Sequence, residues 1–226
     1  MNIAIILAGG VGSRLGLEKP KQYVEIKGKT VIEYTLKNFA VSEFVDKIVV
    51  VITKDWQEII GEKLKIVCGE KFMGFAIAGE SRQHSVLSGL RYLQSQGVSF
   101  YDKVMIHDAA RPCVSLNLIN RCFKTEDYDG VMPVIKVKDT IYSSDGDKII
   151  NLLDRDKLFA GQSPEVFLFG KYFAVHDDLS EREIGQIRGS SEIAFKKGLK
   201  IHLIEGEEIN FKITTIEDLE KFKRLV

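Results

Sequence analysis

Residues 2–23 read NIAIILAGGVGSRLGLEKPKQY, a short apolar strand followed directly by a glycine-rich turn. Glycine adopts backbone angles that a β-carbon forbids, so a glycine-rich main chain can wrap closely around phosphates and direct N–H groups at them. The glycines of this turn are Gly9, Gly10 and Gly12, and the cations that follow are Arg14, Lys19 and Lys21. Together they predict a strand that leads into a binding loop for a nucleoside triphosphate.

Two better-known phosphate loops do not fit this spacing. A Walker A loop ends in Gly-Lys-Ser/Thr, but Gly12 is followed by Ser13 and Arg14. A dinucleotide-binding turn needs a glycine where Leu15 stands and an acidic residue after the next strand, which ends at Thr53. The glycines alone also allow a tight turn without a ligand, and the basic residues after them weigh against that alternative.

The composition favours one compact unit that binds a small ligand. The chain has 226 residues, 45% of them hydrophobic, which is enough for one full core. Lysine plus arginine equals aspartate plus glutamate at 32 each, so the basic excess typical of nucleic-acid binding is missing. No apolar run approaches the roughly 18 residues of a membrane span, and we expect no leader ahead of the first strand.

The three cysteines indicate a reducing compartment. They are odd in number and lack the paired spacing of metal ligands, which suits packing roles in a reducing environment: Cys68, Cys113 and Cys122. We therefore expect a cytoplasmic protein without a nucleic-acid or membrane partner.

Apolar runs alternate with helical patterns along the first half of the chain. The runs, typical of buried parallel strands, are residues 3–7, 48–52, 75–78 and 104–107. Helix caps are predicted at Thr30 with Glu33, at Asp55 and at Ser81. This alternation predicts an α/β fold, a Rossmann-like, open, twisted and mostly parallel sheet flanked by helices. Since ligands bind beyond the carboxyl ends of such strands, we expect the glycine loop, residues 79–85 and residues 107–108 to meet at one edge.

The second half contains a hairpin pattern. Residues 136–155 alternate apolar and polar positions around Ser-Asp-Gly-Asp, a turn signal. They predict a protruding β-arm, although a plain surface hairpin of the main sheet fits the periodicity equally well. Further on, residues 201–204 and 211–214 read as strands, and Thr215 with Asp218 predicts the cap of a final helix.

Six segments, taken in order, carry a family resemblance. They are LAGGVGSRLG with KPKQY, GESRQHSV, HDAARP, KDTI, DRDKLFAGQSP, and NFKITT with EDL. This order resembles the cytidylyltransferases that activate phosphorylated polyols, which act on 2-C-methyl-D-erythritol 4-phosphate or ribitol 5-phosphate. The resemblance covers nearly the whole chain and implies a single nucleotidyltransferase domain, residues 1–226. It also implies transfer of CMP from CTP to a polyol phosphate, release of pyrophosphate, and Mg²⁺ as the cofactor.

The resemblance assigns residues to the CTP side of the site. Arg14 and Lys21 would stabilise charge on the α-phosphate, and Asp108 would contact the ribose or the Mg²⁺. His107 is interpreted as structural, because a phosphate nucleophile is already ionised and needs no base. Ser81 is also open to a purely structural role, as a helix cap. The residues expected to cradle CTP are Leu7, Ala8, Gly9, Gly10 and Gly12, and those expected at cytosine and ribose are Gly79, Glu80, Ser81, Arg82 and Ser85.

The resemblance also implies an acceptor side that two subunits share. Thr140 and Arg155 match arm positions that reach into the neighbouring subunit to hold the acceptor's phosphate, while Arg111 and Lys212 bind it from the first subunit. Arginine suits this role because its fork can donate two parallel hydrogen bonds to a phosphate. A homodimer is therefore expected, with the β-arm used for dimerisation. The alternative for Arg155 is a surface ion pair with a neighbouring aspartate.

Three segments depart from the methylerythritol branch of the family. Residues 8–10 read Ala-Gly-Gly for Ala-Ala-Gly, residues 163–165 read Ser-Pro-Glu for Thr-Pro-Gln, and residues 188–192 read RGSSE where an acidic stretch is usual. The first change, and residues 161–162, resemble the ribitol branch. The expected acceptor is therefore D-ribitol 5-phosphate, giving CDP-ribitol.

Other readings stay open. 2-C-methyl-D-erythritol 4-phosphate, the acceptor in isoprenoid synthesis, is the alternative substrate, and the changed segment 188–192 fits neither branch. A sugar-1-phosphate nucleotidyltransferase is disfavoured by the arm residues, and a non-catalytic nucleotide-binding module would keep the loop without turnover.

Overall fold

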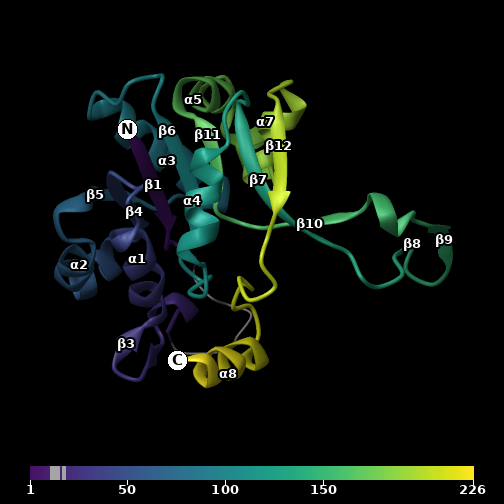
Figure 1. The fold of residues 1–226 in the computed structure, drawn as a ribbon, viewed down its shortest axis with the longest axis horizontal. Coiled ribbons are helices and arrows are strands. Elements are labelled where there is room, and N and C mark those ends of the chain that lie inside the picture. The colour runs from purple at the N-terminus through teal and green to yellow at the C-terminus, as the bar shows by residue number, and fades with distance from the viewer. Residues whose placement is uncertain (11–15, 17–18) are drawn as a thin grey trace.

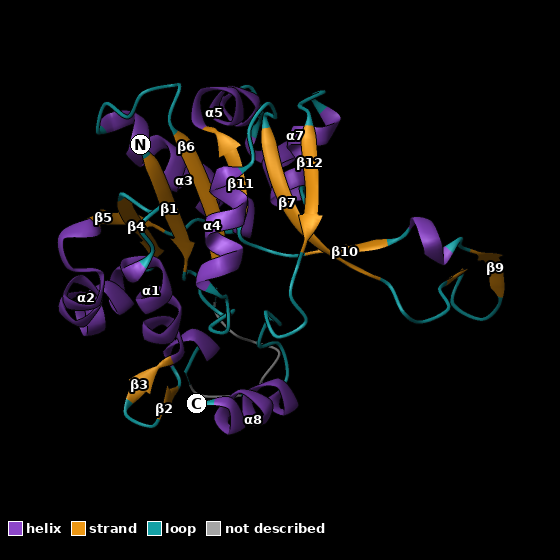
Figure 2. Ribbon diagram, viewed as in Figure 1, coloured by secondary structure: helices purple, strands orange, loops and turns teal. Residues whose placement is uncertain are grey.

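The computed structural model describes residues 1–10, 16 and 19–226. Within them, eight strands form a central sheet in the order β10-β7-β11-β6-β1-β4-β5, with β12 paired to β7 (Figure 2). The strands are β1 (Asn2–Leu7), β4 (Lys47–Ile52), β5 (Phe72–Ile77), β6 (Lys103–Asp108), β7 (Gly130–Lys136), β10 (Phe159–Gly161), β11 (Glu165–Leu168) and β12 (Ile201–Glu205). The expected α/β fold is confirmed.

Most neighbouring strands run parallel. β1 pairs with β4 and β6 in parallel, β4 with β5, and β7 with β12. β11 is antiparallel to both β6 and β7, and β10 is antiparallel to β7. Since β1, β4, β5 and β6 share one direction, their carboxyl ends meet at one edge, where Leu7 pairs with Asp108.

Helices cover both faces of the sheet because the central strands are apolar on both sides. In β1, Ala4 and Ile6 pack with α1 (Val31–Val41), α2 (Lys54–Cys68) and α4 (Leu116–Lys124). Ile3 and Ile5 pack on the other face with α3 (Arg82–Ser95), α5 (Phe169–Asp177) and α7 (Ser190–Lys196). Residues 3–6 are fully buried, so each carries its full share of hydrophobic stabilisation, about 1.5–3 kcal/mol for each isoleucine.

Most predicted caps are confirmed, and one is wrong. Thr30 and Glu33 form the capping box of α1, and the Ser81 hydroxyl accepts the His84 N–H at the start of α3. Helix α2 begins one residue before Asp55, with Thr53 as its N-cap. Asp55 lies instead in the first turn, where its negative charge is favourable beside the free N–H groups.

The C-terminal segment contains one wrong strand prediction. Residues 211–214 belong to no strand, and their backbone bond to the body of the protein runs from the Ile213 N–H to the Ala110 carbonyl, 2.9 Å. They connect the sheet to α8 (Ile216–Leu225), and Phe211 and Ile213 pack in an apolar cluster with Ile26 and Leu219. The capping box of Thr215 and Asp218 at α8 is confirmed.

A separate arm projects from the body. β8 (Tyr142–Ser144) and β9 (Ile149–Leu152) pair with each other as a two-stranded sheet of their own, with η4 (Arg155–Lys157) on the return path. Figure 1 shows this arm extending from the ends of β7 and β10, so a protruding arm is correct and a hairpin of the main sheet is not.

The remaining elements are short. β2 (Glu25–Ile26) and β3 (Lys29–Thr30) form a small hairpin ahead of α1, after the single turn η2 (Lys21–Tyr23). η3 (Gly69–Lys71) follows α2, and α6 (Glu181–Gln186) lies between α5 and α7. None of the described helices is both long and apolar enough to cross a membrane.

Candidate functional site

The glycine loop and the segment before α3 are in contact, as expected. A β-carbon on Gly9 would lie 2.2 Å from the β-carbon of Ala78, so only glycine allows this close approach. The Gly79 N–H donates to the Ser85 hydroxyl at 3.1 Å, which holds the turn against the start of α3. Leu7 to Gly10 and residues 79–85 therefore lie side by side at the carboxyl ends of β1 and β5.

Two residues that the sequence analysis did not single out hold the loop in place. The Gln22 side-chain amide donates to the carbonyls of Ala8 and Gly10, each at 2.7 Å, and the Tyr23 hydroxyl donates to the Ala8 carbonyl at 2.7 Å. Both side chains are buried. Gln22 and Tyr23 belong to the motif KPKQY. From the sequence alone its lysines are the more obvious site residues, because only they carry charge.

These anchors place Lys21 beside the loop. Lys21 opens η2 immediately before Gln22 and is partly buried. Two other predicted residues of the loop, Gly12 and Arg14, lie outside the described residues.

Asp108 is the centre of a charged cluster at the end of β6. Its Oδ1 accepts the Arg82 Nε–H at 2.9 Å, and its Oδ2 accepts the Lys212 ammonium at 2.9 Å. Arg111 Nε lies 3.8 Å from the same Oδ2. Burial alone would raise the pKa of Asp108, but these three cations outweigh it and hold the pKa well below its usual value. The structure thus brings together four predicted site residues from distant parts of the sequence.

His107 lies next to this cluster and contacts Ser163 and the backbone of Arg111. It is fully buried, its Nδ1 lies 3.2 Å from the Ser163 hydroxyl and its Nε2 lies 3.2 Å from the Arg111 carbonyl. Burial lowers its pKa to about 3, so the imidazole is neutral at physiological pH. These contacts agree with a structural role.

Arg82 also contacts the segment that departs from the family pattern. Its Nη1 donates to the Ser190 hydroxyl at 2.7 Å, and its Nη2 lies 3.9 Å from Glu165 Oε1. Ser191 donates to the other oxygen of Glu165 at 2.5 Å. Residues 163–165 and 188–192 depart from the methylerythritol pattern, and the sequence links the second segment to the choice of acceptor. Glu165, Ser190 and Ser191 thus join the site through Arg82.

The other residues of the α3 segment have simpler surroundings. Ser81 caps α3 and its hydroxyl lies 2.8 Å from His84 Nδ1, so the structural part of its expected role is confirmed. Glu80 is exposed next to it.

The arm, which carries Thr140 and Arg155, projects away from the sheet in which β6 ends at Asp108 (Figure 1). Thr140 and Arg155 are both exposed, and Arg155 donates to the Lys138 carbonyl at 2.9 Å. In the described structure Asp154 pairs with Lys157 at 3.1 Å rather than with Arg155. The guanidinium therefore has donors left for a further group.

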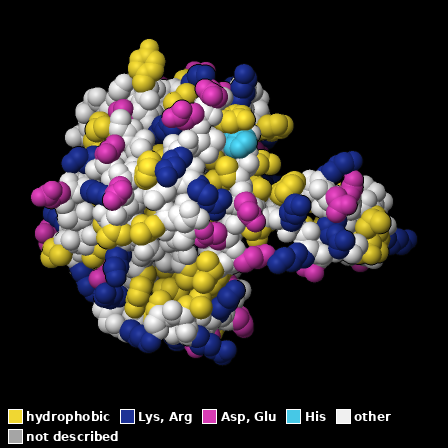
Figure 3. Space-filling model, viewed as in Figure 1, with side chains coloured by type: hydrophobic (Ala, Val, Ile, Leu, Met, Phe, Trp, Pro, Cys, Tyr) yellow, Lys and Arg dark blue, Asp and Glu magenta, His cyan; other side chains and the backbone are white. Residues whose placement is uncertain are grey.

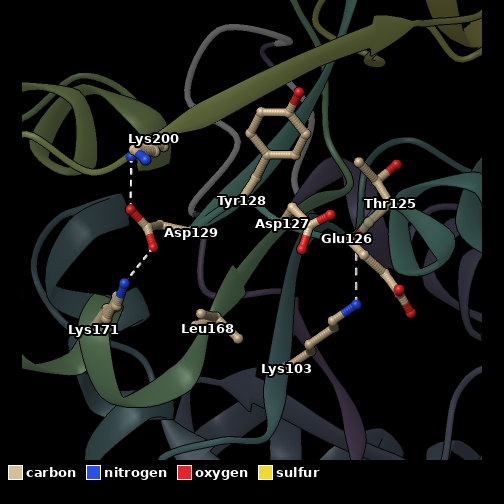
Figure 4. Close-up of a pocket in the computed structure, with 9 residues that line it drawn as sticks. All are labelled: Lys103, Thr125, Glu126, Asp127, Tyr128, Asp129, Leu168, Lys171 and Lys200. Atoms are coloured by element: carbon tan, nitrogen blue, oxygen red, sulfur yellow. Dashed lines mark hydrogen bonds and ion pairs between the residues drawn. The ribbon is translucent and has the colours of Figure 1, made fainter.

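A pocket of about 490 Å³ lies at the opposite end of the sheet (Figure 4). Lys103 begins β6 there, five residues before Asp108, and Asp129 pairs with Lys171 and accepts the backbone N–H of Lys200. The pocket is lined by Lys103, Thr125, Glu126, Asp127, Tyr128, Asp129, Leu168, Lys171 and Lys200. It includes none of the predicted site residues and is separate from the candidate site.

Known proteins match this chain over nearly its whole length. The family model of 2-C-methyl-D-erythritol 4-phosphate cytidylyltransferase, IspD, matches residues 2–225. An enzyme of that name from Lachnospira eligens is 37% identical over 97% of this chain and 96% of its own. A ribitol-5-phosphate cytidylyltransferase from Lactiplantibacillus plantarum is 31% identical over 100% of this chain and 98% of its own.

Longer relatives and solved structures agree. The chain spans 55% of the bifunctional enzyme IspD/IspF of Wolbachia pipientis wMel, with 34% identity over 98% of this chain. The crystal structure of 2-C-methyl-D-erythritol 4-phosphate cytidylyltransferase from Francisella tularensis superposes with a TM-score of 0.82 at 26% identity, covering 100% of this chain and 99% of the other. Because fold, ordered motifs and whole-length matches coincide, the chain belongs to the 2-C-methyl-D-erythritol 4-phosphate cytidylyltransferase family of CTP-dependent nucleotidyltransferases.

Proposed function

We propose that this chain transfers CMP from CTP to a phosphorylated polyol and releases pyrophosphate. The observation that carries the proposal is the cluster of Arg82, Arg111 and Lys212 around Asp108, next to the glycine loop. An oxygen of the acceptor's phosphate attacks the α-phosphorus of CTP, and the bond from that phosphorus to the bridging oxygen of the β-phosphate breaks. Fixed cations in a site sheltered from water stabilise the charge that spreads over the phosphoryl oxygens by several kcal/mol.

The residues divide between the two substrates. The loop with Arg14 and Lys21 holds the triphosphate, and residues 79–85 hold cytosine and ribose. Arg111 and Lys212 bind the acceptor's phosphate, with Thr140 and Arg155 from the arm of a second subunit. No general base is needed, because the attacking phosphate is ionised at neutral pH, and the buried, neutral His107 agrees with this assignment.

Asp108 is the residue that would hold Mg²⁺. Among the described residues no group of three or more metal-ligating side chains occurs, so these residues would supply at most two ligands to the ion. This fits Mg²⁺, which keeps several waters and takes its other oxygen ligands from phosphates. Bound there, the ion would draw charge from the triphosphate, while Arg82 and Lys212 orient the carboxylate.

For the acceptor we propose D-ribitol 5-phosphate. Ala-Gly-Gly at residues 8–10 and Gly-Gln at residues 161–162 support it, and a ribitol-5-phosphate cytidylyltransferase is 31% identical to this chain. 2-C-methyl-D-erythritol 4-phosphate is the second candidate, because the matching family model and the 37% identical relative carry that name.

Pyrophosphate release from CTP and Mg²⁺ in the presence of each acceptor tests this proposal. We expect the highest kcat/KM with D-ribitol 5-phosphate, and UTP in place of CTP serves as the control for the base. Faster turnover with 2-C-methyl-D-erythritol 4-phosphate would replace the first acceptor by the second. Tight CTP binding without turnover of either acceptor would agree with the proposed nucleotide site but reject both acceptors.

A further inference from the structure

Arg82 is held by two carboxylates that come from different strands. Asp108 at the end of β6 accepts its Nε–H at 2.9 Å, on one side of the guanidinium. Glu165 at the start of β11 lies 3.9 Å from Nη2, on the other side. A planar guanidinium that is fixed at one nitrogen can still turn about that bond, so the contacts on its Nη side, with Ser190 at 2.7 Å and Glu165 at 3.9 Å, determine the direction in which the group faces.

Glu165 is itself held by the first turn of α7. Ser191 donates to it at 2.5 Å, while Ser190 accepts the Nη1–H of Arg82 at 2.7 Å. Glu165 is only 6% exposed, and Ser190 is fully buried. Burial raises the pKa of Glu165, and Arg82 and the two serines oppose that rise. A buried carboxylate needs such partners, so these contacts form one connected unit.

The charge of the cluster makes the role of Glu165 testable. In the described part of the site, Arg82, Arg111 and Lys212 carry three positive charges against the two carboxylates of Asp108 and Glu165. Removal of Glu165 would leave more positive charge near the triphosphate. Electrostatics alone therefore predicts tighter CTP binding without Glu165, whereas loss of orientation of Arg82 predicts weaker binding.

We propose that Glu165 is a positioning residue for nucleotide binding: with Ser190 and Ser191 it fixes the Arg82 guanidinium toward CTP. The segment of residues 188–192 then acts on the nucleotide through Arg82, rather than on the acceptor's phosphate. This inference rests on the proposed role of Arg82 in CTP recognition.

Calorimetric titration of Glu165→Gln with CTP and Mg²⁺ tests the inference. Glutamine keeps the size of the side chain and removes its charge, and we expect about tenfold weaker CTP binding, the size expected for one lost charged contact. The KM for the acceptor at saturating CTP should stay unchanged, whereas a general loss of structure would change this KM as well. Glu62→Gln is the matched control, because Glu62 is exposed on α2 and pairs with Lys65.

A charge-relocation variant provides a second readout. Ser190→Asp combined with Glu165→Gln moves the carboxylate from β11 to α7 while the net charge stays the same, and we expect it to regain most of the lost CTP affinity. Ser191→Ala adds no volume and removes one hydrogen bond to Glu165, so it should weaken CTP binding in the same direction but less. Thermal melting of each variant reports whether the fold is kept.

The outcomes separate this inference from the proposed function. Wild-type protein that fails to bind CTP rejects the proposed function and the inference with it. Wild-type protein that binds CTP, with Glu165→Gln and Ser191→Ala binding equally well or more tightly, overturns the inference alone. A raised acceptor KM with unchanged CTP affinity also overturns it, because Glu165 would then act on the other substrate.

Discussion

At the scale of single residues, the two adjacent loop glycines have different reasons to be glycine. Gly9 packs so closely on Ala78 that an added β-carbon would lie 2.2 Å from the alanine methyl group. A β-carbon on Gly10 would meet no atom within 4 Å among the described residues. Gly9 is therefore required for packing, whereas packing among the described residues does not require a glycine at position 10, which agrees with its proposed place beside the phosphates.

This difference predicts effects of different size on the free energy of unfolding for two matched variants. Gly9→Ala should lower the free energy of unfolding by about 1–3 kcal/mol, the usual cost of overpacking. Gly10→Ala should change it by less than about 0.5 kcal/mol, as for other open positions. Urea unfolding measures both values, and CTP titration of Gly10→Ala reports how closely the loop approaches the phosphates. Equal destabilisation by both variants would contradict this account of the loop.

At the scale of elements, the connection between β12 and α8 carries a site residue. Lys212 reaches Asp108 from this irregular segment, which is fixed by the Ile213 bond to Ala110 and by the cap of α8. Asp218 accepts the N–H groups of Thr214 and Thr215 at 2.8 and 3.0 Å. The cap of α8 therefore holds the segment that positions Lys212.

We predict that Asp218→Ala lowers stability and weakens acceptor binding together. The loss of the capping contacts should reduce the free energy of unfolding by about 1–2 kcal/mol, and the looser segment should raise the acceptor KM more than the CTP KM. Chemical unfolding and steady-state kinetics measure the two effects. Glu220→Ala, an exposed residue of the same helix that pairs with Lys223, is the control. A variant that loses stability but keeps its acceptor KM would show that the segment needs no cap.

At the scale of the whole molecule, the arm presents apolar side chains that its own body does not cover (Figure 3). Tyr142, Ile149, Ile150 and Leu152 are 53 to 67% exposed. Their grouping on a projecting hairpin supports the proposed dimer, in which the arm of one subunit would pack on the other and bring Arg155 to its site.

Mixing two inactive variants tests this arrangement. If Arg155 acts in the neighbouring subunit, a Lys21→Met subunit paired with an Arg155→Ala subunit forms one site that has both residues intact. Unfolding and refolding the two variants together should then restore about a quarter of the wild-type activity, since half of the random dimers are mixed and each has one working site. Activity that stays at the level of the separate variants would place Arg155 in the site of its own chain or outside any site.

Two buried histidines predict how the stability of the molecule depends on pH. Burial lowers the pKa of His107 to about 3 and that of His176 to about 4, from an ordinary value of 6.5. Between these pKa values the unfolded chain therefore binds more protons than the folded chain. The free energy of unfolding falls as the pH drops below 6.5 toward the folded pKa values. Each histidine should remove about 2 kcal/mol between pH 7 and pH 5.

Urea unfolding at pH 7 and pH 5 measures this loss. His176→Phe, which keeps an aromatic ring on Tyr172, should lose about 2 kcal/mol less than the wild type over the same interval. Glu165, whose pKa is raised by burial, acts in the opposite direction but equally in both proteins. An identical loss in the two proteins would mean that His176 is protonated in the folded state.

Local patterns predicted the elements of this fold well. The apolar runs became β1, β4, β5 and β6, and the caps at Thr30, Ser81 and Thr215 were correct because each depends on a few neighbouring residues. Residues 211–214 have the composition of a strand because Phe211 and Ile213 pack in an apolar cluster, but the Ile213 N–H donates to Ala110, after the end of β6, rather than to a strand. The N-cap of α2 lies two residues before the predicted Asp55, because Thr53 is an equally suitable N-cap residue.

The sequence by itself determined the α/β fold, the glycine loop after β1 and the family, because periodicity, caps and ordered motifs are local properties of the chain. Only the tertiary structure decided that Gln22 and Tyr23 hold the loop, and that Glu165 and Ser190 meet Arg82 beside Asp108. Such contacts join residues up to 108 positions apart. The contacts of Arg82 depend on how β6, β11, α3 and α7 pack against one another, and no local pattern encodes that packing.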